Sequence, residues 1–450
     1  MTKPNLIYIF CDQFRRQAVG YMGEDPVVTP HLDKFAREGI VFNQAISNYP
    51  VCSPYRGMLL TGLYPHKNHI FTNCHSESAL QGCYLHEDQV CLSDILGKNG
   101  YELGYIGKWH LDAPTQEQSY YTEGKRKDGL IWDAYTPPGK RRHGFSFWYS
   151  YGCADNHMNP HYWINDAKIE ERLDVCEWSV AHETQVAIEY IKNHEKPFAL
   201  FISFNPPHTD FSSFPQKYLN YYKGKTEKDL LVRANVKNCS QAVKHVKNYF
   251  ATITGIDEHF GRIMQAIQEK GIEDNTIIIF TSDHGEMMGS QGLMHKKIWY
   301  EEAVGVPFIV RWLGQFKHQD VDAQISTIDI MPTILGLVGL EAVIPKECVG
   351  YNFAPSMYNG RYTEAPDSTL YFCNDKQAKG YGRGIRDKRY TFILSEVDGK
   401  QQCSFYDRKE DPYQMHNGIK NNRELAQIYL EKLKHRLQEI EDPFEIKIQL

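Results

Sequence analysis

Four apolar runs of strand length, each followed at once by polar residues, limit most strongly what this chain can fold into. They cover residues 5–10, 101–106, 197–204 and 275–280. Because successive positions are apolar, aromatic or β-branched, both faces of each strand must be buried, which is typical of a largely parallel sheet covered by helices. Helical spacing occurs at residues 31–40, 92–97, 184–194 and 259–271. We therefore predict a doubly wound α/β domain.

The polar residues that follow these runs are the first candidates for a functional site. They comprise residues 11–13, 107–110, 205–208 and 281–284. Ligands of open α/β sheets bind beyond the carboxyl ends of the strands. The four groups are therefore expected to lie along one edge of the sheet.

The character of the chain changes near residue 367. Shorter apolar runs with turn residues between them, at 369–373, 382–394 and 401–408, predict antiparallel strands. A helix over 424–440 places Leu425, Tyr429, Leu433, Leu437 and Ile440 on one face. We predict a main domain over residues 1–366 and a smaller α+β domain over 367–450. The polar, glycine-containing stretches at 116–142 and 210–238 are predicted to be long surface loops.

Composition excludes several classes of protein. The net charge of −6 provides no basic surface for nucleic acid, and no apolar run is long enough to span a bilayer. The N-terminal residues lack the shape of a signal peptide. Eleven cysteines without a CxxC pair favour a reducing compartment over a disulfide framework or a zinc cluster. We therefore predict a cytoplasmic protein, with a periplasmic or secreted protein that has lost its signal peptide as the alternative.

One short stretch, PVCSPYRGMLLTG at residues 50–62, combines a thiol, a proline and an arginine at Cys52, Pro54 and Arg56. It resembles the sulfatase signature, in which the cysteine is oxidised to formylglycine. Tyr55 stands where many relatives have a small hydroxyl residue, which bears on recognition by the maturation enzyme. Further segments resemble other sulfatase motifs in the family's order, at residues 100–111, 205–210, 280–289, 295–310, 326–339 and 406–417.

The resemblance implies a fold and an activity. The expected fold is an alkaline-phosphatase-like sandwich, with a large mixed, mostly parallel sheet flanked by helices and a smaller C-terminal domain with an antiparallel sheet. The expected activity is hydrolysis of sulfate esters. In the mechanism that the family implies, one hydroxyl of the formylglycine gem-diol at residue 52 attacks sulfur and expels the alcohol. The other hydroxyl is then deprotonated, and C–O cleavage ejects sulfate.

The resemblance also implies roles for the residues around that nucleophile. Arg56 is a fixed cation beside the diol, and a helix starting near Pro54 adds the positive end of its dipole. Lys108 contacts the diol and the sulfate, and His110 takes the proton of the second hydroxyl. Two more residues face the leaving oxygen, His208 as the acid and Lys296, favoured by family spacing over Lys297, as the sulfate clamp.

A divalent metal ion is implied as well. Its predicted ligands are Asp12, Gln13, residue 52, Asp283 and His284, because strand-end oxygens from distant positions can converge on a hard cation. Gln13 stands where many relatives have a second aspartate, so it is either an amide ligand or a purely structural residue. The family implies calcium. With His284 in the set, magnesium and manganese stay open.

Fewer features of the sequence indicate the substrate. Residues 142–163 are dense in aromatic side chains, which predicts either a platform for sugar rings or packing within the core. Candidate substrate-binding residues are Asn73, Asn156 and His157. We expect a sulfated small molecule or glycan as substrate and a formylglycine-generating enzyme as partner. The alternatives are a phosphonate monoester or phosphodiester hydrolase of the same superfamily and a relative that binds glycans without turnover.

Overall fold

The computed structural model describes residues 3–373, 381–397 and 399–450; residues 1–2, 374–380 and 398, which fall within the two predicted domain ranges, lie outside the described part. A ten-stranded sheet with the order β10-β2-β9-β8-β1-β7-β3-β4-β5-β6 crosses the main body. Its strands are β1 (Asn5–Asp12), β2 (Ile40–Phe42), β3 (Glu102–Lys108), β4 (Phe147–Tyr151), β5 (His161–Ile164), β6 (Leu173–Asp174), β7 (Phe198–Pro207), β8 (Thr276–Ser282), β9 (Phe308–Arg311) and β10 (Gln319–Val321).

The middle of this sheet is parallel. Strands β8, β1, β7, β3 and β4 pair in parallel, whereas β9 is antiparallel to β8 and β5 is antiparallel to β4. The four predicted strands are β1, β3, β7 and β8. The predicted mixed, mostly parallel α/β sheet is therefore confirmed.

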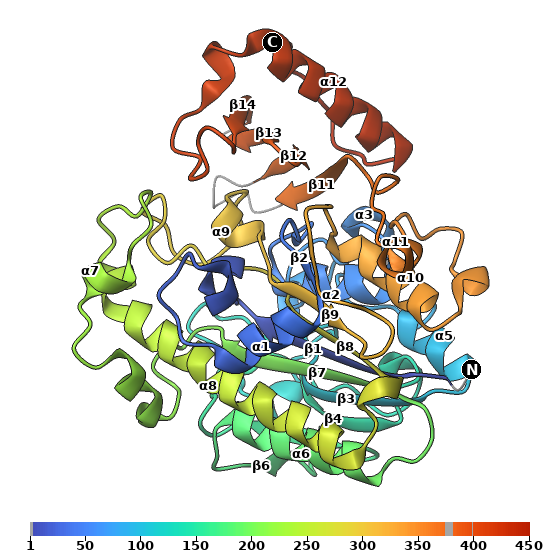
Figure 1. The fold of residues 1–450 in the computed structure, drawn as a ribbon. Helices are drawn as coiled ribbons and strands as arrows, with labels where there is room; N and C mark the ends of the chain where they lie inside the picture. The colour runs from blue at the N-terminus through green and yellow to red at the C-terminus, as the bar shows by residue number, and fades with distance from the viewer. Residues whose placement is uncertain (1–2, 374–380, 398) are drawn as a thin grey trace.

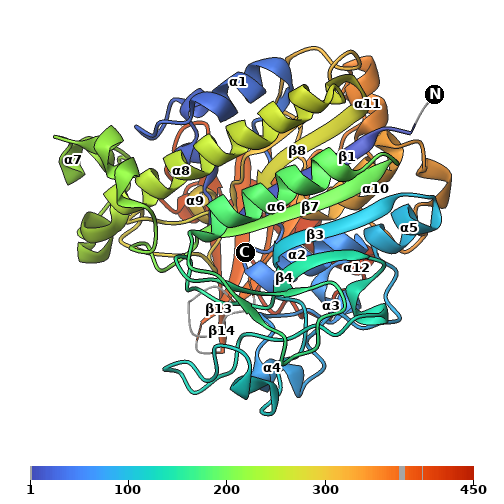
Figure 2. The same cartoon turned by 90° about the horizontal axis from the view of Figure 1, so that it is seen from below.

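Helices cover both faces of the sheet, as Figures 1 and 2 show for α6 and α8 on one face and α5 and α10 on the other. In β1, Ile7, Ile9 and Cys11 contribute to one buried cluster, and Leu6, Tyr8 and Phe10 contribute to the other. This alternation is the period of two expected of a strand buried on both faces. The helices of the main body are α1 (Pro30–Glu38), α2 (Cys52–Thr61), α3 (Pro65–Asn68), α4 (Ser76–Ala79), α5 (Leu92–Lys98), α6 (Ser179–Asn193), α7 (Glu227–Leu230), α8 (Ser240–Lys270), α9 (Glu301–Val304), α10 (Thr327–Leu337) and α11 (Ala354–Asn359).

The second sheet is antiparallel and lies beyond one side of the main body (Figure 1). It contains β11 (Ser368–Cys373), β12 (Gly382–Asp387), β13 (Tyr390–Val397) and β14 (Lys400–Asp407), with α12 (Arg423–Glu439) against it. The buried face of α12 includes Tyr429, Leu433 and Leu437, as the sequence predicted. The boundary between residues 366 and 367 stays a prediction.

A buried ion-pair network joins the second sheet to the main body. Glu301 of α9 accepts hydrogen bonds from Arg386 of β12 at 2.8 and 2.9 Å and from Arg16 at 3.0 Å. Burial raises the pKa of Glu301, but the charges of Arg386, Arg408 and Arg16 outweigh it and hold the pKa well below the usual value. Charges this well buried are stable only in pairs, so the network fixes the C-terminal sheet against α9.

Among the described residues, we find no helix with the length and apolar content to cross a bilayer.

Gly107 determines how closely β3 approaches β7 beside the predicted site. Its φ is +94°, and a Cβ there would lie 2.2 Å from the carbonyl oxygen of Ser203. We expect Gly107→Ala to lower the free energy of unfolding by about 1–3 kcal/mol, because a neighbouring strand must shift. Gly129→Ala is the matched control, since its φ is +83° but a Cβ there meets nothing within 4 Å. Denaturant unfolding of both variants measures the difference, and equal losses would refute the close-approach explanation.

Candidate active site

The carboxyl ends of the central strands meet at one edge of the sheet and gather the predicted residues. Asp12 ends β1, Lys108 ends β3, and Asp283 follows β8 directly. Cys52 is the first residue of α2, which begins two residues earlier than Pro54, where the sequence suggested its start. All ten residues of α2 are buried. Residue 52 therefore lies at the positive end of a helix that is fixed within the core.

Two cations and a carboxylate form a buried ion-pair cluster next to residue 52. Lys108 Nζ lies 2.6 Å from Asp12 Oδ2 and donates to Asn205 Oδ1 at 3.0 Å. Arg56 donates to the Lys108 carbonyl at 2.6 Å and to Ser203 Oγ at 2.7 Å, and it lies 3.4 Å from Asp12 Oδ2. None of the three charged side chains is more than 1% exposed. The cations thus approach residue 52 with their geometry set by hydrogen bonds to β3 and β7.

Four side chains could hold a metal ion. One ligand atom from each of Asp12, Cys52, Asp283 and His284 lies within 4.8 Å of the others. Burial and the charge of Asp12 raise the pKa of Asp283 to about 7, and Asp283 Oδ2 makes no hydrogen bond within the described part of the chain. Two carboxylates that face each other in the core fit a divalent cation, which would neutralise their repulsion.

Gln13 is hydrogen-bonded to a member of this cluster. Its backbone N–H donates to Asp283 Oδ1 at 3.1 Å, its amide N–H donates to Glu286 at 2.6 Å, and its amide oxygen accepts from Lys296. A φ of +71° places the residue in the left-handed region. Whether the amide oxygen binds a metal stays a prediction.

The surroundings of residue 52 favour a negative charge there. Cys52 Sγ lies 3.5 Å from Asp12 Oδ1 and 3.4 Å from His284 Nε2. Burial and Asp12 raise the pKa of the thiol, but the charges of Lys296, Lys108 and His284 outweigh them and lower it well below its usual value. An anion formed at this position is therefore stabilised by the protein itself.

His110 is placed to accept a proton. Its Nε2 lies 3.2 Å from the Cys74 carbonyl oxygen, which can only accept, so Nε2 carries the hydrogen. Nδ1 is buried and makes no hydrogen bond with any described residue. Burial lowers the pKa of His110 to about 4, against the opposing effect of Cys52, so the ring is neutral near pH 7.

His208 has the opposite charge state and is more accessible. Its Nδ1 lies 3.1 Å from Asp155 Oδ1, and 13% of its side chain is exposed. Burial and Lys296 lower its pKa, but Asp12 and Asp155 outweigh them and raise it to about 9. Lys296, the other residue predicted to face the leaving group, is also only partly buried. The two form the more open side of the site.

The three predicted substrate-binding residues differ in their positions. Asn73 Oδ1 accepts from the Ser53 N–H at 3.1 Å, next to residue 52. His157 is buried, and its Nε2 lies 3.1 Å from the His208 carbonyl oxygen, so it supports the backbone of His208. Asn156 is exposed, and the structure records no contact between its side chain and the residues above. Substrate binding by these residues stays a prediction.

The aromatic stretch at residues 142–163 packs in the core. The side chains of Trp148, Tyr149, Tyr151, Tyr162 and Trp163 are at most 7% exposed and belong to the two clusters that flank the large sheet. Packing, rather than a sugar platform, explains its composition.

Sequence reasoning assigned no role to four residues that contact the site. Ser203 and Asn205 hold Arg56 and Lys108, and Asp155 and Arg126 form a chain that leads to His208. Asn205 was among the strand-end candidates at residues 205–208, where it begins the NPPHTD stretch, but it was given no function. Arg126 lies in a long loop whose sequence contains no comparable signal.

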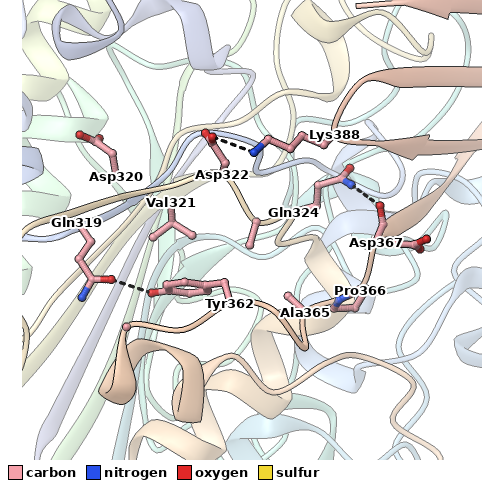
Figure 3. A pocket seen from close by; sticks show the side chains of 12 residues that line it. Gln319, Asp320, Val321, Asp322, Gln324, Tyr362, Ala365, Pro366, Asp367 and Lys388 are labelled. Atoms are coloured by element: carbon pink, nitrogen blue, oxygen red, sulfur yellow. Dashed lines mark hydrogen bonds and ion pairs between the residues drawn. The ribbon is translucent and has the colours of Figure 1, made fainter.

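A separate cavity of about 690 Å³ lies at the edge strand β10, between the two sheets (Figure 3). Two polar contacts lie in its wall: the side chains of Asp322 and Lys388 pair at 3.1 Å, and Gln324 donates to the backbone carbonyl oxygen of Asp367 at 3.1 Å. None of the predicted catalytic or metal-binding residues lines this cavity.

Comparisons with known proteins agree over almost the whole chain. A family model described as Sulfatase matches residues 4–340, and one described as N-sulphoglucosamine sulphohydrolase, C-terminal, matches residues 289–443. The endo-4-O-sulfatase of Bacteroides thetaiotaomicron is 39% identical over 482 residues, covering 98% of this chain and 93% of that protein. The ulvan-active sulfatase of Formosa agariphila is 33% identical over 456 residues, covering 98% and 83%. A solved structure from work on the metabolism of multiple glycosaminoglycans by Bacteroides thetaiotaomicron has a TM-score of 0.90 and 38% identity, covering 98% and 97%.

Proposed function

Because this chain belongs to the sulfatase family and is therefore a sulfuric ester hydrolase, we propose that it removes sulfate from a hydroxyl group of a sulfated glycan, with residue 52 matured to formylglycine. The relative that is 39% identical is an endo-4-O-sulfatase, and the one that is 33% identical is an ulvan-active sulfatase. The solved structure that is 38% identical comes from work on the metabolism of glycosaminoglycans. An O4 sulfate of a glycosaminoglycan is therefore the first substrate to test.

The observation that carries this proposal is the surroundings of residue 52. A buried helix start presents this residue to Arg56, Lys108 and Lys296, while His110 and His208 differ in charge state. In sulfuryl transfer the attacking oxygen must be deprotonated and negative charge builds on the leaving oxygen, and fixed cations stabilise both charges. A neutral histidine and a protonated one provide the base and the acid that the two halves of the reaction need.

Formylglycine at residue 52 and a divalent metal ion both fit the residues around them. Formylglycine, once hydrated, supplies a gem-diol that can take up the sulfuryl group and release it by C–O cleavage. Asp12, Asp283 and His284 would hold a divalent ion, with Gln13 as a further oxygen ligand, and we propose calcium because the donors are mainly oxygen. The bound ion would polarise the sulfate oxygen.

His208 and His110 act at opposite ends of the turnover. His208, protonated at neutral pH, donates its proton to the departing sugar oxygen, and Lys296 neutralises the sulfate beside it. His110 then accepts a proton at Nδ1 as sulfate leaves.

The maturation enzyme must act before this protein folds. Cys52 is 1% exposed, and Tyr55 of the same helix is buried with its hydroxyl 2.8 Å from that of Tyr8. A modifying enzyme cannot reach such a side chain in the native fold. We therefore propose that its substrate is the unfolded or nascent segment around residues 50–62.

The test is a hydrolysis screen with matured, calcium-loaded protein. We expect release of sulfate from sulfated mono- and disaccharides, fastest for the O4 position, and at most trace cleavage of an aryl phosphodiester. Ion chromatography of released sulfate measures the rates. A phosphodiester rate above the best sulfate rate would establish the phosphodiesterase alternative, and equal rates would leave only the assignment to the wider superfamily. Binding of sulfated sugar without turnover would establish the non-catalytic alternative.

A further inference from the structure

Asp155 connects His208 to the loop over residues 116–142. Its Oδ1 lies 3.1 Å from His208 Nδ1 and accepts from Asn205 Nδ2 at 3.3 Å. Its Oδ2 lies 2.9 Å from a guanidinium nitrogen of Arg126. Both carboxylate oxygens are thus occupied, one by the histidine and one by an arginine that arrives from a distant part of the chain.

The contacts of His208 determine which of its two ring nitrogens keeps its hydrogen when the ring loses a proton. Nδ1 lies 3.1 Å from Asp155 Oδ1 and 3.0 Å from the Thr209 carbonyl oxygen. Both of these oxygens are acceptors, so Nδ1 must be the N–H donor. The nitrogen left to exchange a proton is Nε2, and the orientation of the ring follows from the position of the carboxylate.

Arg126 keeps that carboxylate in place. Besides pairing with Asp155, it donates to the Cys153 carbonyl oxygen at 2.8 Å, so it binds both the side chain and the backbone of the segment after β4. Burial raises the pKa of Asp155, but His208 and Arg126 hold it well below the usual value, so the group is charged when His208 is protonated. None of these three residues belongs to the predicted metal ligands.

We propose that Asp155, held by Arg126, is a positioning residue that directs Nε2 of His208 at the leaving oxygen. This inference rests on the acid role of His208 in the proposed function. The other titratable groups around His208 are Asp12, Lys108, Lys296, His157 and His295. Of the two carboxylates near His208, Asp12 and Asp155, Asp155 is the one in hydrogen-bond range of the ring.

The decisive variant is Asp155→Asn, assayed on two substrates that differ in their need for an acid. A sugar alkoxide leaves poorly without a proton, whereas 4-nitrophenolate leaves readily. We expect kcat for the sulfated disaccharide to fall about 10- to 100-fold, the usual cost of losing such a supporting contact, and kcat for 4-nitrophenyl sulfate to fall less than about 3-fold. Asp174→Asn removes an exposed ion pair with Arg172 and is the matched control, with both rates unchanged.

A double-mutant cycle separates positioning from a general structural role. If Asp155 acts through His208, Asp155→Asn adds no loss to His208→Ala on the disaccharide. The basic limb of the pH profile should also move to lower pH in Asp155→Asn, because the carboxylate raises the pKa of His208. Additive losses, or equal losses on both substrates, would overturn the inference.

Arg126→Gln provides a second variant should Asp155→Asn fail to fold. Its side chain is 27% exposed, and we expect the same selective loss on the disaccharide, smaller in size. Equal losses on both substrates would again count against the inference. If His208→Ala itself hydrolyses the disaccharide at the wild-type rate, the acid role in the proposed function fails, which is a different result from failure of Asp155→Asn alone.

Discussion

Replacing Cys52 with alanine should abolish sulfate ester hydrolysis, with kcat/KM falling at least about 10⁴-fold. Alanine cannot be converted to formylglycine, so the proposed gem-diol cannot form, while Arg56, Lys108 and the other predicted metal ligands remain. The side chain removed is small, and its sulfur contacts side chains of the site, Asp12 Oδ1 at 3.5 Å and His284 Nε2 at 3.4 Å, rather than capping α2. The variant should therefore fold, which circular dichroism and its melting temperature would show.

Two comparisons make this result specific. Cys176→Ala removes an exposed cysteine and should leave the rate unchanged. Peptide mass spectrometry of active wild-type protein should find the aldehyde, not the thiol, at residue 52. Near-wild-type turnover by Cys52→Ala would end the proposed mechanism, whatever the other variants show.

The central sheet could be predicted because its strands are apolar on both faces. In β1 the run ends in polar residues, and this change marks where the chain emerges at the edge of the sheet. The boundaries were less exact: β1 extends through Asp12 and β7 through Pro207, because pairing with neighbouring strands continues past the apolar residues. Motif order along the chain then identified which strand ends meet.

Helix α8 begins at Ser240, although we predicted a helix only over 259–271, and its buried residues Ala242, Val246 and Tyr249 follow the helical period from the start, so this part of the helix could have been predicted. Other features depend on tertiary contacts that leave no local pattern. The chain from Arg126 through Asp155 to His208 joins three segments that the fold alone brings together. Aromatic density at residues 142–163 was ambiguous for the same reason, since only the sheet decides which rings are covered.

The two carboxylates at the centre of the site should respond to the same substitution with opposite signs. Asp12 is the partner of Lys108 at 2.6 Å and of Arg56 at 3.4 Å, all buried. Asp283 lies 3.5 Å from Arg56 and shares the cluster with Asp12. Removing the charge of Asp12 therefore leaves buried cations without their partner, whereas removing the charge of Asp283 relieves repulsion between carboxylates.

In chelator-treated protein, we expect Asp12→Asn to lower the free energy of unfolding by about 3–5 kcal/mol and Asp283→Asn to raise it. Burial and Asp12 raise the pKa of Asp283 to about 7, so its ionised form opposes folding above the unfolded-state pKa, and this penalty becomes complete as pH passes 7. The gain from Asp283→Asn should thus be larger at pH 8 than at pH 5. Although burial raises the pKa of Asp12, Lys108 and other cations hold it well below the usual value, so its contribution persists at both pH values and is lost only in stronger acid.

Calcium should reverse the order of stability of wild type and Asp283→Asn, because without metal the variant is the more stable of the two. A ligand that binds only the native state raises the melting temperature, so calcium should stabilise wild type and have little effect on either variant, each of which has lost a charged oxygen ligand. Differential scanning calorimetry with and without calcium at pH 5 and pH 8 measures both effects, and both variants should also lose activity. If Asp283→Asn destabilises the chelator-treated protein as much as Asp12→Asn does, then Asp283 is not destabilised by repulsion from Asp12, and this explanation is wrong. If calcium stabilises Asp283→Asn as strongly as wild type, the cation binds elsewhere.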